Sequence, residues 1–112
     1  MALTHQFKET VQKRIETDPE FRLSLLTEAI NCLIQGEFPI GKAILRDYIN
    51  ATIGFKELGT LTHKSSKSLM RMLSDTGNPQ AKNLLEIIAQ LQKIEGIEFE
   101  VQIHQYFTVS GE

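Results

Sequence analysis

The most informative stretch of the chain is residues 54–79, which read GFKELGTLTHKSSKSLMRMLSDTGNP. Its pattern predicts a helix from Phe55 to about Thr62, a turn, a second short helix and a closing loop of turn-forming residues. Leu58 and Leu61 follow Phe55 at three-residue spacing, so all three side chains are expected to point inward.

The turn in this stretch is His63-Lys64, and Ser65 or Ser66 can cap the helix that follows it. Gly59 lies inside the first helix, where glycine costs about 1 kcal/mol relative to alanine. A glycine there makes sense if another helix crosses closely at that point. Two short helices joined by a tight turn are the layout of a helix-turn-helix DNA reader, in which the second helix enters the major groove.

Positive charge is concentrated in the same stretch. The chain carries a formal charge of -2 and has a pI of about 5.9, which excludes a uniformly basic nucleic-acid binder. Residues 58–74 nevertheless contain Lys64, Lys67 and Arg71 and no acidic residue. A phosphate backbone requires such a local patch rather than a high overall pI. The alternative is that the three cations simply line a solvated face.

The cysteine and the histidines limit the classes of protein to which this chain can belong. A chain of 112 residues is one domain, or one domain with short appendages. Its single cysteine, Cys32, excludes an internal disulfide and favours a reducing cytoplasm. His5, His63 and His104 show no zinc-ligand spacing with this cysteine, so no metal and no cofactor are expected. No catalytic constellation and no membrane-spanning run are evident, so neither an enzyme nor a membrane protein is expected.

Further helices are predicted from capping residues and apolar stripes. They cover Thr4–Thr17, Asp18 to about Gly36, Gly41 to Thr52, and Asn78 to about Gly96. Thr4 is the expected cap of the first helix, whose apolar stripe starts at Phe7, and Gly36 and Pro39 are expected to end the second. Asp18 and Asn78 are each followed by a proline, which is favoured at the first helical position. The predicted fold class is all-α, with five to six helices and a short C-terminal β-strand. The expected divisions are a helical extension (1–17), a helix-turn-helix domain (18–96) and a strand and tail (97–112).

The predicted strand is Ile97–Ile103, where apolar and polar residues alternate. A single strand exposes unpaired backbone groups and must pair with something. The partner is another segment of this chain, the same strand of a second subunit, or a different protein. A homodimer through this strand would also present two recognition helices to a palindromic site.

The sequence THKSSKSLMRMLS at Thr62–Ser74, followed by DTGNP, resembles the signature of addiction-module antidote proteins. These are antitoxins of the HigA type, within the Cro/phage-repressor group of lambda-repressor-like helix-turn-helix domains. The resemblance covers roughly residues 18–101. The matching features are Ser65, Ser68-Leu69, Leu73-Ser74, Gly77-Asn78-Pro79, the Asp18-Pro19-Glu20 helix start, the Ala43–Tyr48 helix and Asn83-Leu84-Leu85.

The resemblance implies a transcriptional regulator that represses its own operon, usually as a dimer on palindromic double-stranded operator DNA. It also implies a partner, a small mRNA-cleaving toxin of the RelE-like group, which the antitoxin neutralises. This sequence departs from the family at three positions. His63 stands where the family usually has glycine, Lys64 where it has an apolar residue, and Lys56 where it has a serine or threonine cap.

The resemblance also assigns DNA-contacting positions. Ser65 would contact a phosphate, Ser66 and Lys67 would reach base edges, and Arg71 would reach guanine or a phosphate. The remaining positions near the DNA, closer to its backbone or on the exposed side of the helix, are Lys64, His63, Met70 and Lys82. The plainer alternatives are that the serines are only caps and that Met70 only packs.

Two alternatives to the antitoxin function stay open. One is a phage-type DNA-binding repressor without a toxin partner. The other is an interaction module that keeps the fold and no longer reads DNA.

Overall fold

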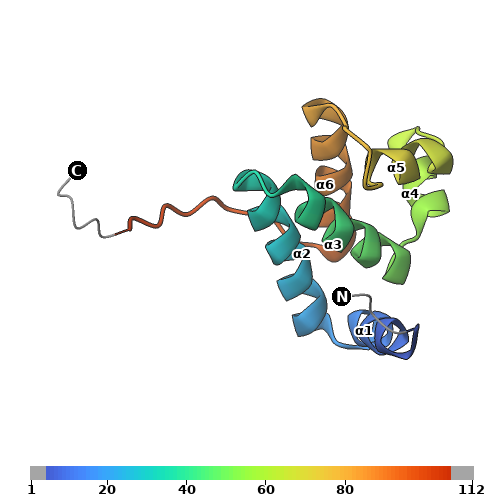
Figure 1. The fold of residues 1–112 in the computed structure, drawn as a ribbon, viewed down its shortest axis with the longest axis horizontal. Coiled ribbons are helices and arrows are strands. Elements are labelled where there is room, and N and C mark those ends of the chain that lie inside the picture. Colours follow the sequence, from blue (N-terminus) through green and yellow to red (C-terminus); the bar gives the residue numbers. More distant parts are fainter. Residues whose placement is uncertain (1–4, 107–112) are drawn as a thin grey trace.

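The computed structural model describes residues 5–106, with side chains described from residue 9 onward, and it is all-helical in this range (Figure 1). The predicted cap Thr4, the side chain of Phe7 and the end of the tail lie outside what is described. Six helices are present: α1 His5–Thr17, α2 Pro19–Ile34, α3 Phe38–Ala51, α4 Phe55–Thr62, α5 Ser66–Met72 and α6 Ala81–Glu95.

The start of α2 is where the sequence predicted it. The Asp18 carboxylate accepts a hydrogen bond from the Phe21 amide at 3.1 Å, and Pro19 occupies the first turn. Arg14 lies over the Phe21 ring, 4.2 Å from its centroid, and its Nε is 3.5 Å from the Asp18 carboxylate. These contacts fix the corner between α1 and α2.

Two helix starts differ from the prediction. α3 begins at Phe38 rather than Gly41, because Pro39 opens this helix instead of ending the previous one. Proline is tolerated there because the first turn has no internal partner for its missing N–H. α6 begins at Ala81, so Asn78 is not its cap; Gln80 holds that position and makes no side-chain hydrogen bond to the helix.

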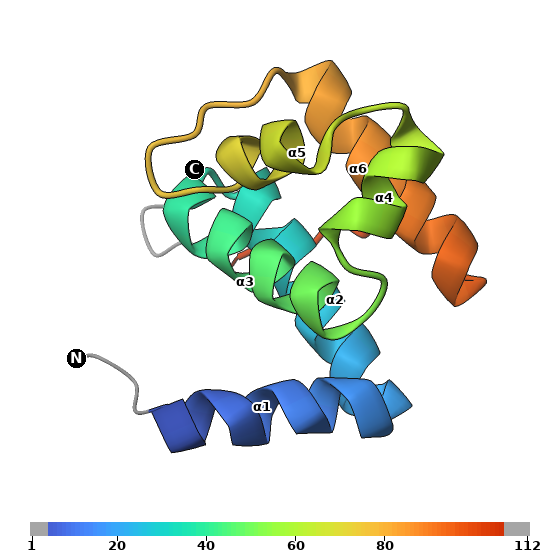
Figure 2. The same ribbon diagram turned by 90° about the vertical axis from the view of Figure 1, so that its right-hand side faces the viewer.

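The core is built around α3. α1 and α2 both pack against α3, and α4 packs against α5 and α6 (Figure 2). The largest side chains buried from solvent come from every helix: Ile15, Leu26, Leu45, Tyr48, Ile49, Leu58, Leu69, Leu73, Ile87 and Leu91. Leu61, predicted to point inward, is instead 41% exposed. The buried positions of the eight-residue helix α4 are Phe55, Leu58 and Gly59, so its buried face ends before Leu61.

A polar triad ties three helices together. Arg22 of α2 donates two hydrogen bonds to the Glu95 carboxylate of α6, at 2.8 and 3.1 Å, and Tyr48 of α3 donates its hydroxyl to the same carboxylate. The hydrogen bonds to Glu95 raise the pKa of Arg22. Burial and the neighbouring carboxylate raise the pKa of the Tyr48 hydroxyl, so it remains a donor.

The predicted strand over Ile97–Ile103 is not formed: residues 97–106 have no regular secondary structure. Gly96 ends α6 in the left-handed conformation, with φ of 68°, and the chain then leaves the helices as an extended arm (Figure 1). A strand requires a second strand as its hydrogen-bonding partner, and no described segment of the same chain pairs with residues 97–106 in this way. We call residues 97–106 the arm.

Candidate nucleic-acid interface

The outward side of α5 carries a basic stripe. Lys67, Met70 and Arg71 are all exposed, and their spacing of three and four residues places them on one face of the helix. Leu69, on the opposite face, and Leu73, immediately after the helix, are fully buried and hold it on the core. The structure therefore brings three of the predicted site residues together on one accessible surface.

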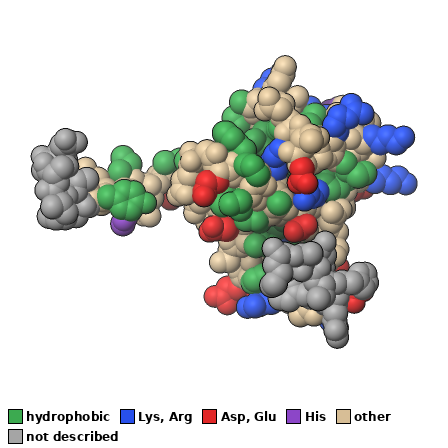
Figure 3. All heavy atoms as spheres, viewed as in Figure 1, with side chains coloured by type: hydrophobic (Ala, Val, Ile, Leu, Met, Phe, Trp, Pro, Cys, Tyr) green, Lys and Arg blue, Asp and Glu red, His purple; other side chains and the backbone are tan. Residues whose placement is uncertain are grey.

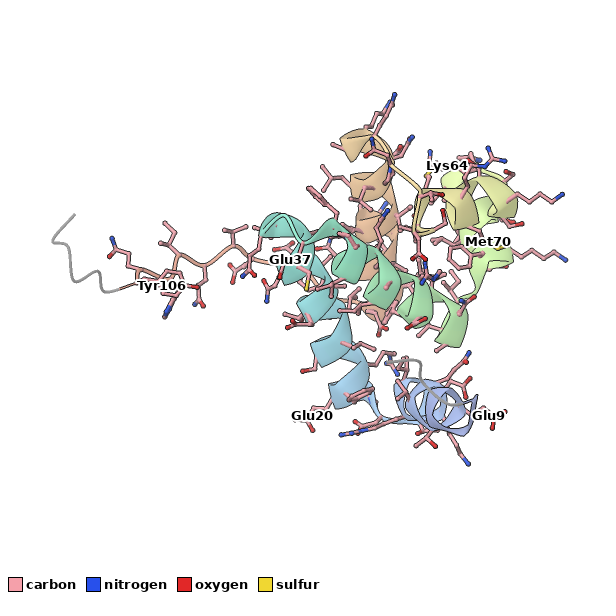
Figure 4. All side chains as sticks on the ribbon, in the orientation of Figure 1. Glu9, Glu20, Glu37, Lys64, Met70 and Tyr106 are labelled. Atoms are coloured by element: carbon pink, nitrogen blue, oxygen red, sulfur yellow. The ribbon has the colours of Figure 1, made fainter. Side chains whose placement is uncertain are left out.

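This surface lies at one end of the molecule. Lys and Arg side chains gather where α4 and α5 lie, on the side opposite the arm (Figure 3). Lys64 and Met70 both belong to this end, and Tyr106 marks the far end of the arm (Figure 4).

The turn before α5 depends on two unusual backbone positions. His63 adopts the left-handed conformation, with φ of 58° and ψ of 39°, and is the one non-glycine residue with positive φ in the described chain. The Lys64 amide then donates to the Gly59 carbonyl at 2.9 Å. A Cβ atom on Gly59 would lie 2.5 Å from the Lys64 carbonyl oxygen, so the close approach predicted at Gly59 is made by the turn itself.

The two serines at the start of α5 have different positions. Ser65 is exposed and its hydroxyl accepts a hydrogen bond from the Ser68 amide at 3.0 Å, which is the capping role that the sequence predicted. Ser66 is the first helical residue and is half-buried. Because the Ser65 hydroxyl remains exposed, capping and contact with an external group are compatible at this position.

Lys64 and Lys82 are not part of the basic stripe. The Lys64 ammonium lies 3.3 Å from the Glu86 carboxylate of α6, and its side chain is only 17% exposed. This ion pair reduces the positive charge that Lys64 presents outward. Lys82 is exposed in the first turn of α6, on a different helix from the stripe.

Two further basic residues, which the sequence analysis did not select, hold the end of α5. Lys42 of α3 is 6% exposed and donates from Nζ to the carbonyls of Ser74, at 3.0 Å, and Gly77. Arg46, one turn later, donates to the Leu73 carbonyl at 2.7 Å. Carbonyls at a helix C-terminus lack internal partners and carry partial negative charge, so Arg46 satisfies the end of α5. Lys42 holds the loop that follows it.

A sequence signal for Lys42 was available. Lys42 lies three residues before Leu45 and seven before Ile49, so it continues the apolar stripe of α3 rather than its polar face. A lysine on such a stripe is expected to bury its stem and find acceptors for its ammonium.

No protein-family model, no curated protein and no solved structure matches this chain. Among the described residues, no group of three or more histidine, cysteine or acidic side chains is placed to hold a metal ion. No helix in the same part of the chain has the length and apolar character needed to cross a membrane.

Proposed function

We propose that this protein is a DNA-binding transcriptional regulator that reads double-stranded operator DNA with α5. The observation that carries the proposal is the exposed stripe of Lys67, Met70 and Arg71 on a short helix that is fixed at both ends. Ser65 caps its start, Arg46 satisfies a carbonyl at its end, and Lys42 holds the loop that follows. A recognition helix needs this kind of anchoring because base contacts depend on its exact placement.

The charges on α5 favour contact with an anionic partner over a merely solvated face. Lys67 and Arg71 are four residues apart on one face, and like charges at this spacing mildly destabilise an isolated helix. No acidic residue lies between Leu58 and Ser74 to relieve the repulsion. A phosphate backbone would relieve it, and arginine contacts to guanine are worth about 1–3 kcal/mol of base discrimination.

We further propose that the regulator is a cytoplasmic antitoxin that represses its own operon. The resemblance of Thr62–Pro79 to addiction-module antidote proteins supports this, and it implies a RelE-like toxin as the protein partner. We also propose that the protein acts as a homodimer through its C-terminal arm. Val101 and Ile103 of the extended arm are exposed, and no described segment of the same chain pairs with the arm as a strand. Reading a palindrome also requires two recognition helices.

The DNA-binding proposal is tested with the promoter region of the protein's own gene. Binding of this DNA is measured by mobility shift and fluorescence anisotropy from about 50 to 200 mM salt. The double variant Lys67→Ala/Arg71→Ala should lose specific retardation, and its salt slope should fall by about 2. The double variant Lys13→Ala/Lys93→Ala removes the same charge from exposed positions on α1 and α6 and should bind as the wild type does. Equal binding by the α5 variant would overturn the assignment.

The antitoxin proposal is tested with the neighbouring gene. A small basic reading frame beside this one, whose expression arrests growth unless this protein is co-expressed, is the expected result. An unrelated, non-toxic neighbour would instead favour a repressor without a toxin partner.

A further inference from the structure

The arm has an apolar face that its own domain covers only in part. Side chains in an extended chain alternate, so Ile97, Phe99, Val101 and Ile103 share one face. Ile97 and Phe99 are half-buried against the core, whereas Val101 and Ile103 are 87% and 89% exposed. The face that anchors the arm therefore continues past the edge of the domain, where no described residue covers Val101 and Ile103.

An apolar groove lies at the root of this arm. Its volume is about 360 Å³, and it runs between the end of α2, the start of α3 and the first half of α6, with Phe99 closing one side. Three of the side chains that line the groove are large and mostly exposed: Ile34 is 67%, Phe38 55% and Leu85 61% exposed. Hydrophobic side chains are visible both on this part of the domain and along the arm (Figure 3).

The arm does not fill the groove of its own chain. The Gln92 side chain accepts a hydrogen bond from the Phe99 amide at 2.8 Å, and the Gln92 carbonyl accepts one from the Ile97 amide at 3.0 Å. These bonds fix the root, and the chain beyond it points away from the helices (Figure 1). Residues 100–106 in extended form reach about 20 Å, which is enough to cross two packed helices of a neighbouring molecule.

We propose that the arm of one chain docks in the groove of a second copy, and that the second copy returns its arm in the same way. The observation behind this choice of partner is that one chain carries both an uncovered apolar arm and an uncovered apolar groove, side by side. In a dimer with two-fold symmetry each arm root lies next to the partner's groove. Both arms and both grooves are then covered in the same dimer. The exchange rests on the homodimer of the proposed function and defines its contacts.

DNA binding can be tested separately from arm exchange, because the arm and α5 are different surfaces. α5 and the arm lie at opposite ends of the molecule (Figure 1), so an exchanged dimer keeps both basic stripes uncovered. Oligomeric state is measured without DNA, and a failure of either proposal therefore does not mimic a failure of the other.

The test is the mass of the full chain by sedimentation equilibrium from about 1 to 200 µM. The wild type should reach twice its chain mass of 12.7 kDa. The arm variant Val101→Glu/Ile103→Glu and the groove variant Leu85→Glu should each raise the dissociation constant at least tenfold. Ile94→Lys changes a 44%-exposed apolar residue nine positions from Leu85, on the opposite side of α6, and should leave the dimer intact.

Mixing the arm variant with the groove variant distinguishes arm exchange from other modes of dimerisation. The arm variant keeps a normal groove and the groove variant keeps a normal arm, so their mixture restores one intact arm–groove contact and should form heterodimers. Circular dichroism and thermal melting should show folded monomers for both, since every substituted side chain is more than half exposed. A monomeric wild type would overturn the proposal. A groove variant that dimerises like the wild type would overturn it too, because the arms would then pair only with each other or elsewhere.

Discussion

The ammonium group of Lys42 donates a hydrogen bond to the carbonyl oxygen of Ser74 at 3.0 Å, from a position where only 6% of the lysine is exposed. A buried cation of this kind is normally paired with a carboxylate. Here its described hydrogen-bond partners are main-chain carbonyls that follow α5. The charge on α3 thus holds the loop that follows the proposed recognition helix.

Loss of this contact should destabilise the fold. Lys42→Met keeps most of the apolar stem and removes the ammonium. The Gly77 carbonyl then loses the donor described for it, and the Ser74 carbonyl keeps only the bond from the Gly77 amide. We expect the free energy of unfolding in urea to fall by about 1.5–3 kcal/mol, the range for hydrogen bonds to charged groups. Lys56→Met, at an exposed position of α4, is the matched control and should change stability by less than about 0.5 kcal/mol. Equal stability of the two variants would contradict this role for Lys42.

Helix positions were largely predictable because their signals are local. Asp18-Pro19 and Ser65 act within one turn of the chain, so α2 and α5 begin where predicted. Pro39 was misread because a proline both follows helix ends and opens helices, and sequence alone does not separate these roles. The boundary between α2 and α3 depends instead on how tightly the chain turns at Gly36, whose φ is 85°.

The parts that the sequence did not predict depend on tertiary contacts. The place of Lys42 on the apolar stripe of α3 indicates burial, but its partners, the carbonyls of Ser74 and Gly77, are known only from the structure. Ile97–Ile103 has the alternation of a strand, but a strand also needs a partner, and the single chain supplies none in its described residues. The exposed stripe on α5 was predicted from the sequence. The pairing of Lys64 with Glu86 was not predicted, because it joins residues 22 positions apart.

Gly59 should not tolerate a side chain. A Cβ atom there would lie 2.5 Å from the Lys64 carbonyl, and backbone on both sides leaves little room to shift. Gly59→Ala should therefore lower the free energy of unfolding by about 1–3 kcal/mol, despite the better helix propensity of alanine. Thr60→Ala, the next and exposed residue of α4, serves as the control and should be close to neutral. A stabilised Gly59→Ala variant would show that the turn is looser than described.

The left-handed conformation of His63 predicts that glycine is the better residue at this position. The left-handed conformation costs a non-glycine residue about 1–2 kcal/mol. The extra entropy that glycine loses on folding offsets only part of this advantage of glycine. We expect His63→Gly to raise the free energy of unfolding by about 0.5–1 kcal/mol, and His63→Val to lower it because branching at Cβ disfavours positive φ. Denaturant midpoints for the three proteins should rank Gly, His and Val in that order. A glycine variant less stable than the wild type would mean that the imidazole makes a compensating contact.

The polar triad predicts how stability depends on acid. Burial alone would raise the pKa of the Glu95 carboxyl, but hydrogen bonds from Arg22 and Tyr48 and the charge of Arg22 outweigh burial and lower this pKa below its ordinary value of 4.5. A carboxyl whose pKa is lower in the folded state stabilises the fold above its unfolded pKa, and this contribution is lost as pH falls through the folded pKa.

We therefore expect the urea midpoint of the wild type to fall between about pH 5 and pH 3, and to fall less steeply in Glu95→Gln, which cannot ionise. The variant should also be less stable at pH 7, by about 1–3 kcal/mol, because Arg22 loses its charged partner. Glu98→Gln removes an exposed carboxyl three residues later, and should keep the wild-type pH profile. Parallel profiles for the wild type and Glu95→Gln would show that other carboxyls control acid unfolding.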